Sequence, residues 1–184
     1  NRLLQGDVGS GKTLVAAACI WFAWKNGFQS AFMAPTEILA DQHFKTFCEF
    51  LEPLGLRVGK LTGSMTAKSK RETRDALALG MLDLVVGTHA LLSENVEFNR
   101  LGLVITDEQH RFGVEQRSTL SAKGENPHVL VMSATPIPRT LALIIYGDLD
   151  VSVIDEMPPG RQKVDTYVVG EEMRPRIEKF IRNL

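Results

Sequence analysis

Residues 6–13 read Gly-Asp-Val-Gly-Ser-Gly-Lys-Thr and match the phosphate-binding pattern G-x-x-x-x-G-K-[ST] at every fixed position. The apolar pair Leu3-Leu4 precedes this octet, and an alanine-rich helical stretch from Leu14 to Trp24 follows it. A strand, a glycine-rich loop and a helix in this order are the local context that the pattern requires. The octet therefore predicts a site for a nucleoside triphosphate.

The chemistry of this loop assigns roles to its positions. The glycines let the backbone curl so that successive N–H groups point at phosphate oxygens, and the dipole of the following helix adds positive potential. We expect Lys12 to reach the β- and γ-phosphates and the Thr13 hydroxyl to coordinate Mg²⁺. The expected nucleotide-binding residues are Gly6, Asp7, Val8, Gly9, Ser10, Gly11, Lys12 and Thr13.

An acidic pair follows a buried strand further along the chain, where Leu103-Val104-Ile105-Thr106 runs into Asp107-Glu108-Gln109-His110. Open α/β sheets bind ligands beyond the carboxyl ends of their strands, so we expect the pair beside the phosphate loop. Asp107 is expected to hold Mg²⁺, and Glu108 to orient and polarise the attacking water. We expect His110 to couple hydrolysis to the next motif, with capping of a helix as the alternative.

A second strand end carries hydroxyl groups. Val129–Ser133 reads as a buried strand, and it leads into Ser133-Ala134-Thr135-Pro136. Two hydroxyls at a strand end can sense the γ-phosphate region and hydrogen-bond to the acidic pair, although an ordinary strand–turn–helix reads the same way. Ser133 and Thr135 therefore join the expected nucleotide-binding residues.

The order of elements predicts the fold class. Runs such as Leu-Gly-Leu-Val-Ile-Thr and Val-Leu-Val-Met are apolar throughout, which is typical of parallel strands buried on both faces. Such strands alternate with helical patterns, so we expect a doubly wound α/β domain with a mostly parallel sheet. The expected strands are Arg2–Gln5, Ser30–Ala34, Val58–Leu61, Leu82–Gly87, Leu101–Thr106, Val129–Ser133 and Val151–Ile154. The expected helices are Lys12–Lys25, Glu37–Leu51, Lys68–Leu79, Val114–Ala122 and Pro138–Tyr146.

The C-terminal part differs from the rest. Met157-Pro158-Pro159-Gly160 is a cluster of residues that break regular structure, and beyond it 163–169 reads as a strand and 171–184 as a charged helix. These elements either extend the same domain or form a linker and the start of a second domain. We favour the second interpretation, because Pro-Pro-Gly is typical of a boundary. The expected domains are 1–157 and 158–184, and both chain ends suggest a piece of a longer protein.

Composition narrows the possible partners and the cellular compartment. Among 184 residues, 21 Lys and Arg oppose 22 Asp and Glu, so the net charge of −1 gives no global support for nucleic-acid binding. Cys19 and Cys48 have no metal-ligand spacing, which suits a reducing compartment. No apolar stretch reaches the roughly 18 residues of a membrane span. We expect a cytoplasmic protein with no membrane partner.

The phosphate loop, Asp107–His110 and Ser133–Thr135 occur in the order and spacing of superfamily 2 helicases and translocases, which the chain resembles over essentially residues 1–157. The resemblance implies the RecA-like P-loop NTPase fold of their first motor lobe, with ATP and Mg²⁺ as cofactors.

Three further segments resemble the DNA-contacting motifs of that superfamily: Ala34-Pro35-Thr36-Glu37-Ile38-Leu39-Ala40, Leu61-Thr62-Gly63-Ser64 and Gly87-Thr88-His89. The resemblance implies that they grip the sugar–phosphate backbone, which hydroxyls and backbone N–H groups can contact without reading bases. The expected DNA-binding residues are Pro35, Thr36, Thr62, Gly63, Ser64, Thr88 and His89.

Longer matches narrow the resemblance to the RecG family of bacterial branch-specific DNA helicases. They comprise residues 107–117, 133–143, and Tyr-Gly-Asp-Leu-Asp-Val-Ser at 146–152 followed by Pro-Pro-Gly-Arg. This implies movement on branched DNA, at forks and Holliday junctions, in recombination and repair. It also implies a second helicase lobe and a wedge domain in the full-length protein.

Other functions remain as alternatives. The transcription-repair coupling factor shares Arg-Phe-Gly-Val and Thr-Pro-Ile-Pro-Arg-Thr, but its acidic motif usually reads Asp-Glu-Glu-His, so Gln109 favours RecG. A kinase, GTPase or ABC-type ATPase is disfavoured, because neither Asn-Lys-x-Asp nor Leu-Ser-Gly-Gly-Gln is present. Without the second lobe and its arginine finger, we expect this chain alone to bind Mg-nucleotide weakly and hydrolyse it poorly or not at all. Alone it would then be a nucleotide-binding module without turnover.

Overall fold

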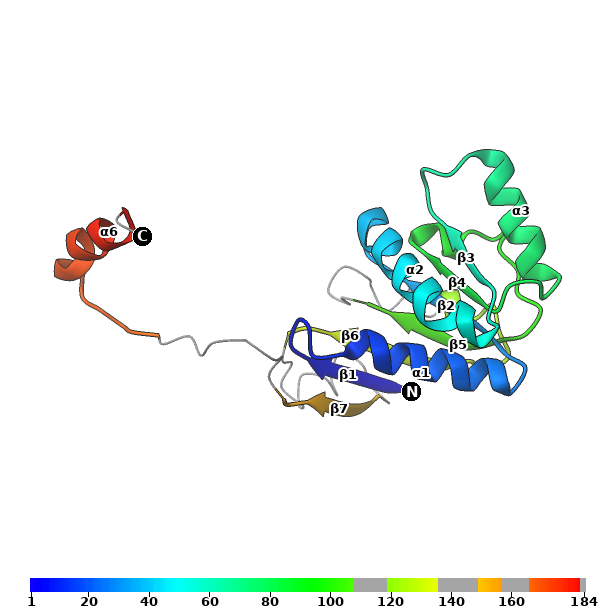
Figure 1. Cartoon of the computed structure of the whole chain (residues 1–184), viewed down its shortest axis with the longest axis horizontal. Helices are drawn as coiled ribbons and strands as arrows, with labels where there is room; N and C mark the ends of the chain where they lie inside the picture. The colour runs from blue at the N-terminus through cyan, green and yellow to red at the C-terminus, as the bar shows by residue number, and fades with distance from the viewer. Residues whose placement is uncertain (108–118, 136–148, 157–165, 183–184) are drawn as a thin grey trace.

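A parallel β-sheet is the centre of the computed structural model, which describes residues 1–107, 119–135, 149–156 and 166–182. Within these residues the sheet is seven-stranded, with the order β3-β4-β2-β5-β6-β1-β7 and every pair parallel (Figure 1). The strands are β1 (Arg2–Gly6), β2 (Gln29–Met33), β3 (Val58–Leu61), β4 (Leu84–Gly87), β5 (Leu101–Thr106), β6 (His128–Ser133) and β7 (Asp150–Ile154). The helices are α1 (Lys12–Lys25), α2 (Glu37–Leu51), α3 (Ala67–Ala78) and α6 (Arg174–Arg182), with 3-10 turns η1 (Glu52–Leu54), η2 (His89–Leu92) and η4 (Glu171–Met173).

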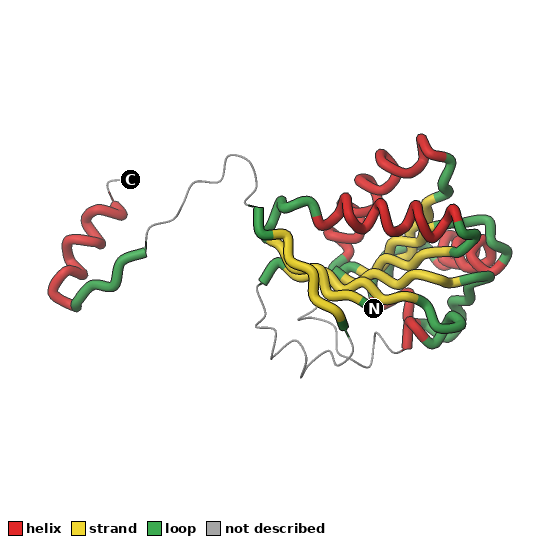
Figure 2. The backbone as a smooth tube through the Cα atoms, turned by 90° about the horizontal axis from the view of Figure 1, so that it is seen from below, coloured by secondary structure: helices red, strands yellow, loops and turns green. Residues whose placement is uncertain are grey.

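Helices pack against both faces of this sheet, and Figure 2 shows α1 and α2 along one of them. On one face α1 and α2 pack against a core that includes Phe32 and Ile105. On the other face α3 and η2 pack against a second core that includes Met33 and Val104. Because neighbouring residues of β2 and β5 enter opposite cores, these strands are apolar throughout. The predicted doubly wound α/β class is confirmed.

Local sequence signals set the starts of the helices. The Thr36 hydroxyl accepts a hydrogen bond from the amide of Leu39 at 3.3 Å, which caps α2. The Thr66 hydroxyl does the same for Ser69 at 3.2 Å and caps α3. The buried side of α2 then repeats every three or four residues, through Ala40, His43, Phe47 and Leu51.

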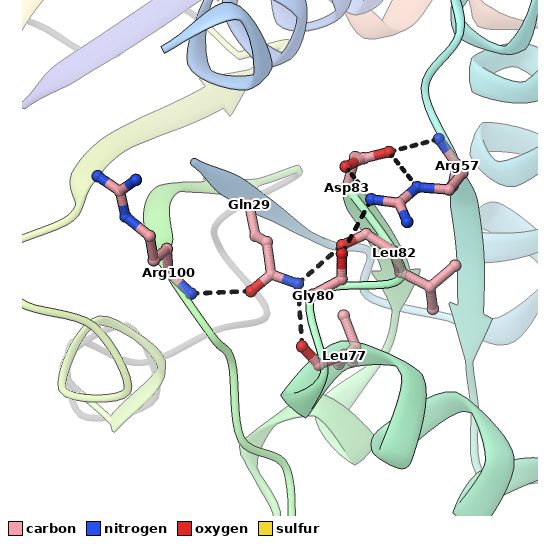
Figure 3. Close-up of polar contacts among 7 residues, drawn as sticks. All are labelled: Gln29, Arg57, Leu77, Gly80, Leu82, Asp83 and Arg100. Carbon is pink, nitrogen blue, oxygen red and sulfur yellow. Dashed lines mark hydrogen bonds and ion pairs between the residues drawn. The ribbon is translucent and has the colours of Figure 1, made fainter. Parts of the chain in front are cut away.

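A buried amide ties together the amino ends of the central strands (Figure 3). The Gln29 side chain, 6% exposed, donates from Nε2 to the carbonyl oxygens of Leu77 at 3.0 Å and Leu82 at 2.7 Å. Its Oε1 accepts from the Arg100 amide at 3.0 Å. One side chain thereby satisfies backbone groups at the end of α3 and at the entries to β4 and β5.

An ion pair lies beside this amide, also drawn in Figure 3. Arg57 donates from Nη2 to Oδ1 of Asp83 at 2.7 Å and from Nε to Oδ2 at 2.9 Å. The hydrogen bonds to Asp83 raise the pKa of Arg57, so the guanidinium stays charged. Both polar contacts lie at the amino ends of the strands, and the expected functional residues follow the carboxyl ends.

Two sequence expectations need correction. Residues 166–169 form no strand, because β-branched side chains do not make one without a neighbouring strand to pair with, and 163–165 lie outside the described residues. The C-terminal helix is regular α-helix only from Arg174 to Arg182. Most of the helix expected at 114–122 and all of that at 138–146 fall outside the described residues. In the part of the chain that is described, no helix is long and apolar enough to cross a membrane.

Candidate functional site

The phosphate loop joins β1 to α1 and has the backbone that its glycines allow. Gly9 and Gly11 have φ values of 82° and 92°, a left-handed region that residues with a Cβ rarely adopt. At Gly6, a Cβ would lie 2.5 Å from Oγ of Ser10 and 3.1 Å from Cβ of Ile154. Glycine is therefore required at these three positions by geometry.

Lys12 lies folded over its own loop. Its Nζ donates to the carbonyl oxygen of Gly6 at 2.7 Å and to that of Asp7 at 2.8 Å. These bonds place the positive charge inside the curve of the loop. The Ser10 hydroxyl is buried there, and no partner for it is found among the described residues. A cation, a buried hydroxyl and curled backbone are the groups that bind phosphate.

A cavity of about 520 Å³ brings this loop together with the acidic strand end. Asp107 is 8% exposed and follows β5, which is separated from β1 by β6 alone in the sheet order. Lys12, Thr13 and Asp107 all line the cavity. The structure therefore places Asp107 beside the phosphate loop, as the sequence predicts for the acidic pair. Glu108 and His110 lie outside the described residues.

The oxygen groups in this cavity fit magnesium. Mg²⁺ is usually held by one or two carboxylates together with substrate phosphates, and here a carboxylate and a hydroxyl line the same cavity as the phosphate loop. Among the residues that the structure describes, no group of three or more His, Cys, Asp or Glu could hold a metal. The Asp107 carboxylate and the Thr13 hydroxyl therefore suit a cation that is also held by the phosphates of the nucleotide.

A histidine that the sequence analysis did not select also lines the cavity. His43, from α2, places Nε2 at 2.8 Å from Oδ2 of Asp107. The available signal was a polar residue on the apolar side of α2, between Ala40 and Phe47. Its partner is 64 residues away, so local spacing could not identify it.

The two hydroxyls at the carboxyl end of β6 contact each other. Oγ of Ser133 lies 3.1 Å from Oγ1 of Thr135 and accepts from the Thr135 amide at 3.3 Å. Met132 and Ala134, next to them in sequence, line the cavity. The two residues are close to the site, and their contact with nucleotide stays a prediction.

The three expected DNA-contacting turns follow β2, β3 and β4, which are neighbours in the sheet. Their carboxyl ends therefore meet on the half of the sheet away from β1. Gly63, Ser64 and His89 are exposed, whereas Thr62 and Thr88 are each 2% exposed. Pro35 and Thr36, in the turn after β2, are partly exposed. Five of the seven expected residues are therefore at least partly accessible, and the two buried ones are threonines.

Comparison with known proteins assigns this chain to a protein family. The family model for the DEAD/DEAH box helicases matches residues 1–144, and the chain belongs to this family. It is 61% identical over 177 residues to the ATP-dependent DNA helicase RecG of Acidithiobacillus ferridurans, covering 96% of this chain and 26% of that protein. The RecG of Bacillus subtilis strain 168 is 55% identical over 181 residues, with 98% and 26% covered.

A solved structure gives the same result. A RecG bound to a three-way DNA junction matches with a TM-score of 0.78 and 49% identity, over 98% of this chain and 24% of that one. The resemblance to RecG expected from the sequence is confirmed. The chain spans about a quarter of the length of these relatives.

Proposed function

We propose that this chain is the first motor lobe of an ATP-dependent DNA helicase that moves on branched duplex DNA. One observation carries the proposal: the phosphate loop and Asp107 line a single cavity at the carboxyl edge of the sheet. The similarity to RecG proteins, one of them bound to a three-way DNA junction, supports branched DNA as the partner. Forks and Holliday junctions are the expected substrates.

Each part of the site has a task in this proposal. The backbone N–H groups of residues 6–13 bind the phosphates of ATP, and Lys12 leaves its two carbonyl partners to contact the β- and γ-phosphates. Thr13 and Asp107 would hold Mg²⁺, which would supply positive charge beside the phosphates. Glu108 orients the attacking water, and His110, Ser133 and Thr135 link hydrolysis to the DNA-contacting surface.

The remaining expectations complete the proposal. Residues 158–184 are a linker and the start of the second helicase lobe, and the exposure of every described residue of α6 but one suits an element whose partner lies elsewhere. The second lobe and a wedge domain are partners within the full-length protein, which we place in the cytoplasm.

The motor lobe of the transcription-repair coupling factor is the alternative function, because it shares part of the same sequence motifs.

The test uses the full-length protein, with ATP hydrolysis measured on forked DNA and on linear duplex. Wild type should hydrolyse ATP faster with the fork, and Glu108→Gln should keep Mg-ADP binding while losing hydrolysis. Fork regression without RNA polymerase would support the RecG-like function. Displacement of stalled RNA polymerase, without activity on forks, would support the coupling factor instead.

A further inference from the structure

The carboxylate of Asp107 has a buried partner outside the motifs that define the site. Nε2 of His43 lies 2.8 Å from Oδ2 of Asp107, and the two side chains are only 11% and 12% exposed. His43 belongs to α2, and Asp107 directly follows β5. We propose that His43 is a positioning residue, which holds the Asp107 carboxylate in the orientation that the nucleotide site uses.

The backbone at Asp107 is fixed independently of this contact. Its amide donates to the carbonyl oxygen of Met33 at 3.0 Å, which continues the ladder between β2 and β5 by one residue. The torsion that turns a carboxylate is broad, so a fixed backbone does not by itself orient the two oxygens. A second contact, at the carboxylate, is needed for that, and His43 supplies it.

The chemistry of the pair defines the direction of the hydrogen bond. An ionised carboxylate only accepts, so Nε2 of His43 carries the proton and donates it to Oδ2. The other carboxylate oxygen would remain for the metal or one of its waters. Residues that hydrogen-bond to a metal ligand without contacting the metal orient that ligand, and their removal changes the metal affinity.

The imidazole is itself held in place by aromatic rings. Its centroid lies 4.6 Å from that of Phe32 and 6.0 Å from that of Phe47. Both phenylalanines are fully buried, one on β2 and one on α2. A ring packed between fixed neighbours has few rotamers, so its donor is already aimed at Asp107 before nucleotide arrives.

The test compares two substitutions at position 43 in the full-length protein. His43→Phe keeps an aromatic ring against Phe32 and Phe47 but removes the donor, whereas His43→Gln keeps an N–H donor at similar reach. Calorimetry measures ADP affinity with Mg²⁺ and with EDTA, and the ratio of the two affinities gives the contribution of the metal. His43→Phe should lower this ratio about tenfold and leave binding in EDTA unchanged. His43→Gln should restore most of it.

Turnover supplies a second readout. His43→Phe should lower kcat for DNA-stimulated ATP hydrolysis by about tenfold or more, with less effect on KM, and His43→Gln should again recover it. Equal losses with and without Mg²⁺, or failure of both variants alike, would show a packing role and overturn the proposal. So would wild-type behaviour of His43→Phe. If that variant does not fold, His43→Leu takes its place.

The inference rests on the proposed function, and Lys12→Ala separates their failures. If wild type binds Mg-ADP, Lys12→Ala does not, and His43→Phe equals wild type, only the role of His43 is overturned. If wild type shows no gain from Mg²⁺, the proposed function and this inference fall together.

Discussion

The carboxylate of Glu37 accepts a hydrogen bond from the backbone amide of Ser64 at 2.8 Å, and so joins the turn after β2 to the turn after β3. A Cβ at Gly63 would come within 2.9 Å of the same carboxylate oxygen, so a larger residue there would displace the Glu37 side chain. Lys70 also donates to the Gly63 carbonyl from α3. Two of the three turns that are expected to contact DNA are thus fixed relative to each other.

Removing this carboxylate should weaken DNA binding. Glu37→Ala frees the Ser64 amide and loosens the turn at 62–64, so we expect affinity for forked DNA to fall about three- to tenfold. Fluorescence anisotropy of the full-length protein at one fixed salt concentration measures it. Glu49→Ala is the control, because it removes an exposed carboxylate from the same helix. Equal effects of the two changes would mean that charge alone is responsible.

The same contact predicts a dependence on pH. Hydrogen bonds from Ser64, from its side chain and then its backbone, lower the pKa of Glu37 below the ordinary value of 4.5. A lowered pKa means that the contact stabilises the fold above pH 4.5 and is lost as the pH falls through the lower, folded value. The difference in unfolding temperature between wild type and Glu37→Gln should therefore be constant from pH 7 to about 5 and shrink below that. A difference that grows on acidification would contradict the assignment.

Lys12→Ala should abolish detectable binding of Mg-ADP to this chain. The ammonium makes charge-assisted hydrogen bonds within the loop and would make them with phosphate, so its loss should cost at least a factor of about ten. Calorimetric titration of the chain and the variant measures it. Binding that survives the substitution would mean that the nucleotide does not use this loop.

The expected weak catalysis by the chain alone is tested separately. ATP turnover by the chain alone that rises strongly with DNA would contradict it.

Gln29→Leu should destabilise the fold without touching the site. The change leaves two carbonyls and one amide without their buried partner, so we expect a loss of about 2–4 kcal/mol in the free energy of unfolding. Urea denaturation measures it. Gln42→Leu is the matched control, because Gln42 is exposed on α2 and its replacement should change stability by less than about 0.5 kcal/mol. Equal effects would show that the Gln29 bonds contribute little.

The sequence predicted what depends on short patterns. Residues 6–13 and the two buried strands at 101–106 and 129–133 carry their signals in consecutive positions, and the sheet contains both strands within one residue of the expected bounds. On α1, Trp24 packs against the core, whereas Trp21 is 39% exposed and lies against Lys25. The periodicity of apolar residues indicates which side of a helix is buried, but it does not indicate how far the neighbouring elements extend over that side.

Contacts set by strand order could not be predicted in this way. His43 meets Asp107 because β2 and β5 are neighbours, and Glu37 meets Ser64 across 27 residues because the turns after β2 and β3 end on the same edge. Nothing in the residues themselves places β4 between β3 and β2. The missed residues are therefore those whose role depends on the arrangement of the sheet.

The pairing of β7 with β1 has a mechanical consequence. Ile154, the last residue of β7, lies in register with Gly6, where β1 passes into the phosphate loop. In the proposed motor, the chain that continues toward the second lobe therefore leaves the sheet beside the nucleotide. Tension along it would load the evenly spaced hydrogen bonds of this parallel pair in shear, all at once, rather than opening them one by one. The strand would act as a short tether, along which pulling between the lobes reaches the loop that holds the phosphates.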